Sequence, residues 1–455
     1  MSLPLIPTLE ELLHPSSQPE DIRQKALNSE DPLDPIHLFN MTWRQPEGHI
    51  EHRVLPKELT GVDAPIVVMC AYKFPTGSHK VGPAFSCVRE KLLSGEVTLD
   101  GSTLVFPSTG NFGIGGAWVG PRLGFRSLVV LPEEMSAERF EKIRSYGAEI
   151  IATPGCESNV KEIYDCVNEL QKQPQNKIMN QFALFGNYRF HYQVTGGSAV
   201  ELVKELAEQG VGNGSVGAFV SAMGSSGTIA AGDHLKKAHP GCKIVSVEPV
   251  QCPTLFNVGY GGHAIEGIGD KHVTWIHNVR NTDLLVCIED QHCLEGLQLM
   301  QEGRDLLAEQ LGIDPATISN WDGVFGISGV CNILASIKAA KYYELNADQP
   351  VLTVATDGFD RYPSVMKRLT ESVGPVSKDN VAERLAHFRH FDRSWIQEGA
   401  METRRRWHNQ KYFTWVEQQG KSVEELNALW SPSFWEEQVD LIPSLDEATI
   451  KSREK

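Results

Sequence analysis

The fold of this chain is decided at Phe74-Pro-Thr-Gly-Ser-His-Lys80, which follows the apolar run Ala64-Pro-Ile-Val-Val-Met-Cys70. The apolar run is short, rich in β-branched residues and bounded by proline, which is typical of a buried strand. Pro75 and Gly77 end that strand, and the apolar residues after Lys80 recur at the spacing of one helix face. The sequence therefore predicts a strand, a turn and a helix, with Lys80 at the junction between turn and helix.

A lysine at this junction has a specific chemical use. The N-terminus of a helix disfavours positive charge, so the ammonium pKa of Lys80 is expected to fall. A lysine that loses its proton near neutral pH can attack a carbonyl and form a Schiff base. The alternative is a solvated lysine in a turn, and these seven residues alone leave both interpretations open.

Beyond this junction, short apolar runs alternate with amphipathic segments from about residue 64 to residue 375. Such alternation predicts an α/β fold in which parallel strands are covered by helices on both faces. The expected strands are 104–106, 128–131, 149–152, 218–221, 243–247, 284–287 and 351–355. The expected helices are 137–146, 159–171, 197–209, 228–238, 291–311 and 332–345.

The alternating pattern restarts after the glycine-rich segment 210–215, which predicts two α/β lobes. The expected units are an N-terminal extension (1–63), a lobe with Lys80 (64–210), a second lobe (211–377) and a helical, tryptophan-rich tail (378–455). The extension holds little core-forming sequence. Both appendages are expected to pack on the body of the protein or on a second subunit.

The composition excludes several classes of function. The chain has 455 residues and a net charge of −16, which argues against nucleic acid or an anionic membrane as its main partner. No apolar run reaches about 18 residues, so no membrane span is expected. The first 20 residues lack the basic-then-apolar layout of a signal peptide.

Cysteine usage indicates a reducing compartment. The nine cysteines are scattered and form no C-x-x-C pair, so we expect reduced thiols and a cytoplasmic protein. Cys287, His292 and Cys293 lie close together in the sequence, but their spacing fits no standard zinc pattern. No metal site is therefore expected.

A second candidate segment begins at Ser108, directly after the expected strand 104–106. Ser108 and Thr109 offer hydroxyl groups and Asn111 offers an amide. Gly110 allows backbone N–H groups to turn toward a ligand. At the start of a helix, these groups would suit the carboxylate of a substrate. The alternative is a plain turn between strand and helix.

A third segment, Gly224-Ser-Ser-Gly-Thr228, joins an expected strand to an expected helix. Small residues at a helix N-terminus form a nest of N–H donors that suits a dianionic phosphate. No P-loop lysine and no G-x-G-x-x-G spacing occurs here, so a terminal phosphate monoester fits better than a triphosphate or a dinucleotide. A turn without a ligand is the alternative. The expected phosphate-binding residues are Gly224, Ser225, Ser226, Gly227 and Thr228.

A fourth segment follows the last expected strand, where Thr356 or Asp357 could bond a ring nitrogen of a cofactor. A Schiff-base lysine, a phosphate loop, a carboxylate loop and a partner for a ring nitrogen are what pyridoxal phosphate needs to stabilise amino-acid carbanions. The joint occurrence of all four segments predicts this cofactor and a small amino-acid substrate.

These segments resemble the fold-type-II pyridoxal-phosphate superfamily, which includes cysteine synthase, cystathionine β-synthase, threonine synthase and the tryptophan synthase β subunit. The resemblance covers about residues 64–370. It implies a two-lobed fold in which Lys80 holds the cofactor covalently and Asn111 lies beside the phenolic oxygen of the cofactor. Two further positions carry over: Gln181 is implied to bind the substrate carboxylate, and Gly267 of Glu266-Gly-Ile-Gly269 is implied to face the substrate.

The chain also departs from each named enzyme. His79 precedes the lysine, as a histidine does in the tryptophan synthase β subunit. In this chain His79 could steady the cofactor phosphate, relay a proton or be structural. The loops at 108–111 and 224–228 resemble cysteine synthase instead. Either Thr356 or Asp357 is implied to meet the pyridine nitrogen; a threonine leaves that nitrogen largely neutral, whereas an aspartate favours its protonation. The extension and the tail match none of the four enzymes.

The resemblance implies β-replacement on a serine- or cysteine-like L-amino acid through an aminoacrylate, as in cysteine synthase. Lys80 is expected to be the general base at Cα. The alternatives are a β-elimination lyase that gives a keto acid and ammonia, a dehydratase that acts on threonine or homoserine esters, and a non-catalytic regulatory subunit that binds pyridoxal phosphate. A homodimer is expected from the resemblance.

Overall fold

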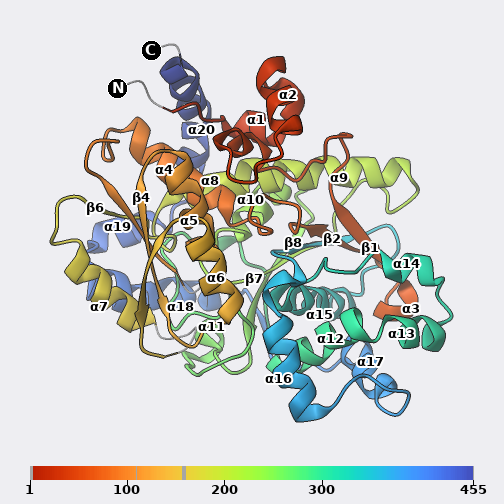
Figure 1. The fold of residues 1–455 in the computed structure, drawn as a ribbon. Helices are drawn as coiled ribbons and strands as arrows, with labels where there is room; N and C mark the ends of the chain where they lie inside the picture. Colours follow the sequence, from red (N-terminus) through yellow and green to blue (C-terminus); the bar gives the residue numbers. More distant parts are fainter. Residues whose placement is uncertain (1–3, 109, 156–159, 454–455) are drawn as a thin grey trace.

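The computed structural model describes residues 4–108, 110–155 and 160–453, which form two sheets covered by helices (Figure 1). The larger sheet has seven strands in the order β1-β2-β10-β7-β8-β9-β11, and the smaller has four in the order β5-β4-β3-β6. Neighbouring strands are parallel except for the edge pairs β1–β2 and β9–β11. The predicted α/β class with parallel strands is confirmed.

The strands lie where apolar runs predict them, and each expected strand is found within two residues of its predicted ends. The strands of the larger sheet are β1 (His52–Leu55), β2 (Ile66–Cys70), β7 (Ala218–Ala222), β8 (Lys243–Pro249), β9 (Leu284–Ile288), β10 (Val351–Ala355) and β11 (Ile396–Glu398). The strands of the smaller sheet are β3 (Thr103–Pro107), β4 (Arg126–Pro132), β5 (Glu149–Thr153) and β6 (Asn176–Ile178). The sequence does not predict β1, β6 and β11, because they are short and largely polar.

The expected helices are all present, with one break: the predicted helix 291–311 is two helices separated by Gly303. Residue 159, the first of another expected helix, lies outside the described residues. The helices of the first half are α1 (Leu9–Leu13), α2 (Glu20–Asn28), α3 (Lys57–Thr60), α4 (Val81–Leu93), α5 (Asn111–Arg122), α6 (Ala137–Ser145), α7 (Val160–Leu170), α8 (Phe185–Phe190), α9 (Gly197–Glu208) and α10 (Ile229–Ala238).

The helices of the second half are α11 (Thr254–Asn257), α12 (Asp290–Glu302), α13 (Arg304–Leu311), α14 (Pro315–Ser319), α15 (Ile327–Tyr342), α16 (Pro363–Val373), α17 (Val381–Arg389), α18 (Met401–Lys411), α19 (Val423–Ala428) and α20 (Pro432–Arg453). A π-helical turn, His191–Gly196, connects α8 to α9. In the described part of the chain, no helix combines the length and the apolar character that a membrane crossing needs.

Helix α5 is glycine-rich, and its sequence alone does not favour a helix, because glycine is a weak helix former. Its glycines instead allow neighbouring elements to approach the helix backbone closely. A Cβ on Gly115 would lie 3.0 Å from the backbone oxygen of Lys80. A Cβ on Gly116 would overlap the ring of Phe106. Helix α5 can therefore pack directly against β3 and against the start of α4, where Lys80 lies.

The carboxyl ends of three neighbouring strands bring the predicted segments together. In the larger sheet, β2 lies beside β10, and β10 lies beside β7. Lys80 follows β2, Thr356 follows β10 and Gly224 follows β7. Because parallel strands end at the same edge of a sheet, these residues meet at one place. The predicted lobe boundary at residue 210 stays a prediction. Strand β2, which precedes Lys80, lies in the same sheet as the strands that follow residue 210.

The N-terminal extension is part of the core, contrary to the expectation that it holds little core-forming sequence. Leu9, Leu38, Met41 and Trp43 are fully buried in the hydrophobic core that also contains residues of α4, α5 and α9. The indole of Trp43 donates a hydrogen bond to the hydroxyl of Thr195 at 3.1 Å. The extension therefore covers the body of the protein rather than trailing from it.

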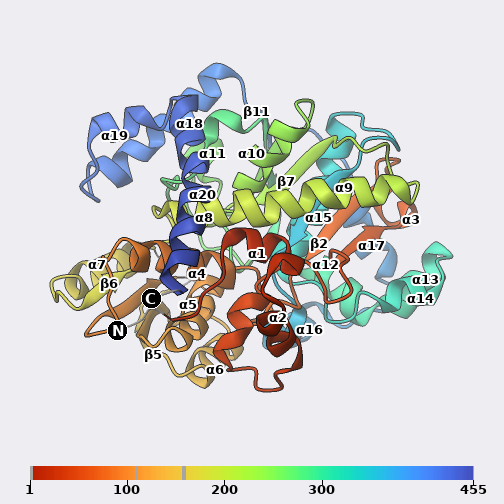
Figure 2. The same cartoon turned by 90° about the horizontal axis from the view of Figure 1, so that it is seen from above.

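The C-terminal tail docks on the body through its tryptophans, as the sequence predicts. The Trp407 and Trp415 rings are buried, and their indole N–H groups donate to backbone oxygens of Leu255 and Val273. Figures 1 and 2 both show α20, the last helix, alongside α1. Asp446 of α20 accepts hydrogen bonds from the backbone N–H groups of Leu9 and Glu10. The two ends of the chain thus stabilise each other.

We predict that Asp446→Asn destabilises the protein by about 3 kcal/mol, because Asp446 is also 2.7 Å from the guanidinium of Arg89, which has no exposed surface. Removing one partner leaves a buried charge without its counter-ion. Urea unfolding measures the change. Glu447→Gln is the matched control, since Glu447 pairs with Lys451 on the exposed side of α20 and is expected to change stability by less than about 0.5 kcal/mol. Equal effects of the two substitutions would contradict the prediction.

Candidate active site

The amine of Lys80 lies inside the protein, at the edge where β2, β10 and β7 end. Its Nζ donates a hydrogen bond to the hydroxyl of Ser225 at 2.9 Å. Burial lowers the pKa of Lys80 to about 8, although the charge of Asp270 acts in the opposite direction. Lys80 precedes the first helical residue of α4, as predicted. The lowered pKa comes from removal of water more than from the helix.

The predicted phosphate loop connects β7 to α10. The side chains of Ser225, Ser226 and Thr228 are buried, and these residues line the same cavity as Lys80. Their backbone N–H groups have no acceptor within the described residues. Ser226 has a φ of 62°, a left-handed conformation that turns successive N–H groups to one side. These donors, at the N-terminus of α10, form a cup for an anionic group.

The glycines of this loop are required by contacts with its neighbours. A Cβ on Gly224 would lie 2.6 Å from the backbone oxygen of Gly267, and a Cβ on Gly227 would overlap the side-chain oxygen of Asn187. Asn187 donates to the hydroxyl of Ser225 and to the backbone oxygen of Gln181, each at 2.9 Å. Asn187 is a positioning residue that the sequence analysis did not single out. Asn187 lies six residues after Gln181, near the start of α8, and no sequence motif marks it.

The predicted carboxylate loop opens α5 beside the same cavity. The hydroxyl of Ser108 accepts hydrogen bonds from the N–H groups of Gly110 and Gly113, at 3.0 Å and 2.9 Å. Ser108 therefore shapes the loop, while Gly110 and Asn111 also line the cavity. Thr109 lies outside the described residues.

Asn111 is held by a network of polar side chains that extends away from the cavity. Its amide donates to the carboxylate of Asp357 at 2.6 Å, and its oxygen accepts from Arg139 at 3.2 Å. Tyr362 donates to the same carboxylate oxygen of Asp357 at 2.8 Å. Arg139 also pairs with Glu266 at 2.5 Å. The network fixes the start of α5 relative to β10 and to the loop that carries Gly267.

The two candidates for the pyridine nitrogen differ in position. Thr356 lines the cavity, and its hydroxyl lies 2.7 Å from the hydroxyl of Ser328. Asp357 is fully buried in the network around Asn111 and does not line the cavity. This geometry favours Thr356, which would leave a pyridine nitrogen largely neutral.

His79 is buried beside Lys80 and lines the cavity. Neither ring nitrogen has a hydrogen-bond partner within the described residues. Its ring lies 4.8 Å from that of His191 and 5.8 Å from that of Trp43, edge to face in both cases. Burial lowers the pKa of His79 well below its usual value, and the charge of Lys80 acts in the same direction. His79 is therefore a neutral imidazole with unused hydrogen-bonding capacity.

Asp270 is a cavity residue that the sequence analysis missed. It follows Glu266-Gly-Ile-Gly269 directly and lines the cavity with Gln181 and Gly267, both of which were predicted. Burial raises the pKa of Asp270 to about 7, although the charge of Lys80 acts in the opposite direction. The sequence signal that could have identified Asp270 is its position directly after the glycine-rich segment 266–269. Lys80 and Asp270 form a pair of titratable groups whose environments bring both pKa values close to neutrality.

The residues present fit pyridoxal phosphate. The cavity offers a buried amine with a lowered pKa, a cup of unpaired N–H groups for a phosphate, and the hydroxyl of Thr356 for a ring nitrogen. The unpartnered nitrogens of His79 and the unpartnered side-chain oxygen of Asn187 lie around the same loop. Unpaired buried polar groups are costly unless a ligand satisfies them.

Comparisons with known proteins agree with this fit. Residues 52–313 match the family described as "Pyridoxal-phosphate dependent enzyme". A cysteine synthase of Staphylococcus aureus is 30% identical over 302 residues, which are 66% of this chain and 88% of that protein. The solved cysteine synthase of Entamoeba histolytica superposes with a TM-score of 0.61 at 23% identity, over 80% of this chain and 96% of that one.

A second solved structure, O-acetylserine sulfhydrylase isoform 3 of Entamoeba histolytica, superposes with a TM-score of 0.58 at 25% identity, over 74% of this chain and 92% of that one. The family match, the relative and the shared fold confirm the resemblance on which the sequence interpretation rests. The chain belongs to the family of pyridoxal-phosphate-dependent enzymes, among the fold-type-II proteins similar to cysteine synthase.

Proposed function

We propose that this enzyme performs β-replacement on a small L-amino acid of the serine type, such as serine or O-acetylserine. The observation that carries the proposal is the placement of the Lys80 amine and the Asp270 carboxyl in one buried cavity next to the phosphate loop. The cysteine synthases that the chain resembles support it. When bound, pyridoxal phosphate supplies a conjugated ring that stabilises negative charge at the Cα of an amino acid.

Lys80 is the proposed base that removes the Cα proton of the substrate. A general base works best when its pKa is near the operating pH, and burial brings the pKa of Lys80 to about 8. The hydroxyl of Ser225 accepts a hydrogen bond from Nζ and so holds the amine beside the phosphate loop. Both features let Lys80 hold and return a proton without a long movement.

Asp270 is the proposed acid for the leaving group. With its pKa raised to about 7, a large fraction of this carboxyl is protonated at neutral pH. A protonated carboxyl in a buried cavity can give its proton to a departing hydroxide and can later take one from an incoming nucleophile. The proposal therefore assigns the two proton transfers to two different residues.

The carboxylate of the substrate is proposed to bind at the start of α5. Gly110, Asn111 and Gln181 line that side of the cavity, and a helix N-terminus favours a negative group. Thr109 is a further proposed contact from the resemblance. The proposed phosphate contacts are Gly224, Ser225, Ser226, Gly227, Thr228 and His79, and the proposed ring-nitrogen partner is Thr356.

A β-elimination lyase is the second candidate, because Asp270 could equally protonate a leaving group when no nucleophile follows. A cytoplasmic location and a homodimer are further proposals; the first is supported by the eight cysteines of the described residues, which are all free thiols.

The substrate assay tests the proposal. The purified protein, saturated with pyridoxal phosphate, is given serine, O-acetylserine, cysteine or threonine, with and without sulfide. We expect the thiol amino acid cysteine as a new product from serine or O-acetylserine only when sulfide is present. Release of pyruvate and ammonia at the same rate without a nucleophile would favour the lyase, and no turnover of any of the four would contradict catalysis.

Asp270→Asn separates the acid role from a structural one. Hydroxide leaves poorly and acetate leaves well, so loss of the acid should lower kcat for serine by about 10²-fold or more and for O-acetylserine by about threefold. In the parent protein the serine rate should fall as pH rises through about 7, where Asp270 loses its proton, and this decline should vanish in the variant. Equal losses with both substrates would contradict the assignment.

Thr228→Val tests the phosphate loop. Thr228 is buried and its hydroxyl makes no hydrogen bond within the described residues, so it is available to a ligand. Loss of one hydrogen bond to a charged group should weaken pyridoxal phosphate binding by about tenfold or more. Equilibrium dialysis measures the affinity, and Thr98→Val, at an exposed threonine, is the control. An unchanged affinity in Thr228→Val would show that the Thr228 hydroxyl does not bind the phosphate.

A further inference from the structure

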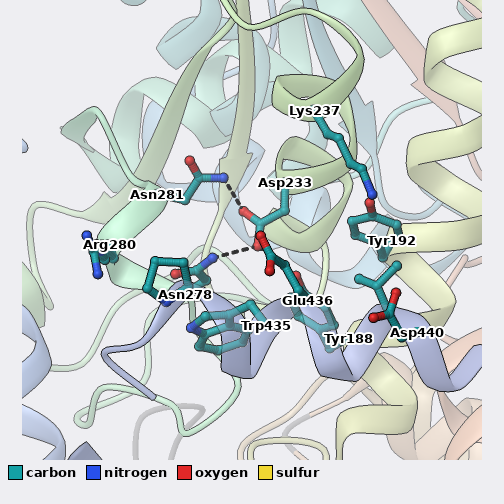
Figure 3. A pocket seen from close by; sticks show the side chains of 12 residues that line it. Tyr188, Tyr192, Asp233, Lys237, Asn278, Arg280, Asn281, Trp435, Glu436 and Asp440 are labelled. Carbon is teal, nitrogen blue, oxygen red and sulfur yellow. Dashed lines mark hydrogen bonds between the residues drawn. The ribbon is translucent and has the colours of Figure 1, made fainter. Parts of the chain in front are cut away.

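A second cavity, of about 530 Å³, lies between α10, the α8 segment and α20 (Figure 3). It shares no residue with the cavity around Lys80. One wall is formed by α10 and the loop at 278–281, and the opposite wall is formed by α20 of the C-terminal tail. Because α20 lies outside residues 52–313, this cavity depends on a part of the chain that the family match does not include.

Aromatic rings form the lining on one side. Tyr188 and Tyr192 stack with ring centres 6.1 Å apart at 23°, and Trp435 lies 5.2 Å from Tyr188. All three residues are largely buried, so their orientation is fixed by packing. Such surfaces bind apolar side chains, and the faces of tyrosine and tryptophan rings also attract ammonium groups.

Asp233 on α10 ties this helix to Tyr188 of α8 and to the loop at 278–281. Its carboxylate accepts hydrogen bonds from Tyr188 at 2.8 Å, from Asn278 at 2.9 Å and from Asn281 at 2.5 Å. Burial raises the pKa of Asp233. Since these three donors already engage its two oxygens, Asp233 is a structural element of the cavity and leaves ligand binding to other residues.

The rim carries charges of both signs. Lys237 on α10 and Glu436 and Asp440 on α20 line the cavity with exposed side chains, and the ion pairs among the described residues include none of them. Glu436 and Asp440 are four residues apart on one helix, where like charges repel each other. Arg280 is engaged elsewhere, since it donates to the backbone oxygen of Trp430.

We infer that this cavity binds a free α-amino acid with a large apolar side chain as an effector. The ammonium group would face Glu436 and Asp440, the carboxylate would face Lys237, and the side chain would lie on the aromatic lining. A zwitterion complements rim charges of both signs, whereas a simple amine has no group that complements Lys237. The volume exceeds what a serine-sized ligand needs, which favours a large side chain.

The cavity is connected to the phosphate loop by two short paths. Tyr188 follows Asn187, which donates to the hydroxyl of Ser225 in that loop. Asp233 and Lys237 belong to α10, whose N-terminus begins at Thr228 and Ile229. A ligand that braces Tyr188 and α10 therefore alters the free energy of the phosphate loop. By linkage, the effector and pyridoxal phosphate change each other's affinity by the same factor.

Calorimetry tests the binding site. L-methionine, L-leucine and L-phenylalanine are titrated into the protein saturated with pyridoxal phosphate. At least one should bind, and Lys237→Met and the pair Glu436→Gln with Asp440→Asn should each weaken it by about tenfold. Glu437→Gln, an exposed neighbour that does not line the cavity, is the matched control and should leave the affinity unchanged.

Three outcomes would overturn the inference. The first is that none of the three amino acids binds. The second is that binding persists unchanged in the cavity variants, which would place the amino acids at Lys80 instead. The third is that the methyl ester of the bound amino acid, which lacks the carboxylate, binds as tightly as the free acid. For the coupling, a saturating effector should change the affinity for pyridoxal phosphate by about fivefold, and an unchanged affinity would refute it.

Discussion

The structure depends on placing the amine of one lysine out of water at the meeting point of three strands. Burial of Lys80 lowers its pKa to about 8, which makes the amine usable as a base near neutral pH. To enclose it, β2, β10 and β7 must be adjacent and parallel, so that the segments after them converge. Helix α5 must also approach the backbone of Lys80 closely, and Gly115 permits that approach. The glycine-rich sequence of α5 is unfavourable for a helix in isolation and is explained by close packing, with Gly115 against Lys80 and Gly116 against Phe106 of β3.

The two ends of the chain extend this arrangement beyond what catalysis requires. The extension places the ring of Trp43 against that of His79, which lines the cavity. The tail places α20 across α8, the helix whose Asn187 holds the phosphate loop. The same tail helix ties to α1 through Asp446. Both appendages, which lie largely outside the residues that match the family, thus contact elements that carry candidate site residues.

Local sequence patterns predict much of the fold and of the site, because they act over a few residues. Apolar runs locate the strands that precede Lys80, Ser108, Gly224 and Thr356, and turns rich in small residues locate the loops. Patterns of this kind carry no information on which strands are neighbours. The sequence therefore does not show that β2 pairs with β10, which follows it by about 280 residues.

The residues that the sequence does not reveal are those whose roles arise from tertiary contacts. Asn187 and Asp270 are ordinary polar residues until the fold places them against Ser225 and Lys80. The same holds for the partner of the pyridine nitrogen, since Thr356 and Asp357 are adjacent and the sequence does not distinguish them. In the structure Asp357 is hydrogen-bonded in the network around Asn111 and lies outside the cavity. The extension is a further case of a role that arises from tertiary contacts. Its leucines and Trp43 are buried only because they pack against residues of helices far along the chain.

The central claim is that Lys80 carries pyridoxal phosphate covalently. Its most direct test is reduction of the cofactor-loaded protein with borohydride, followed by proteolysis and mass analysis of the peptides. The account predicts one modified peptide, with the phosphopyridoxyl group on Lys80. Modification of a different lysine, or recovery of unmodified protein after loading and reduction, would contradict it.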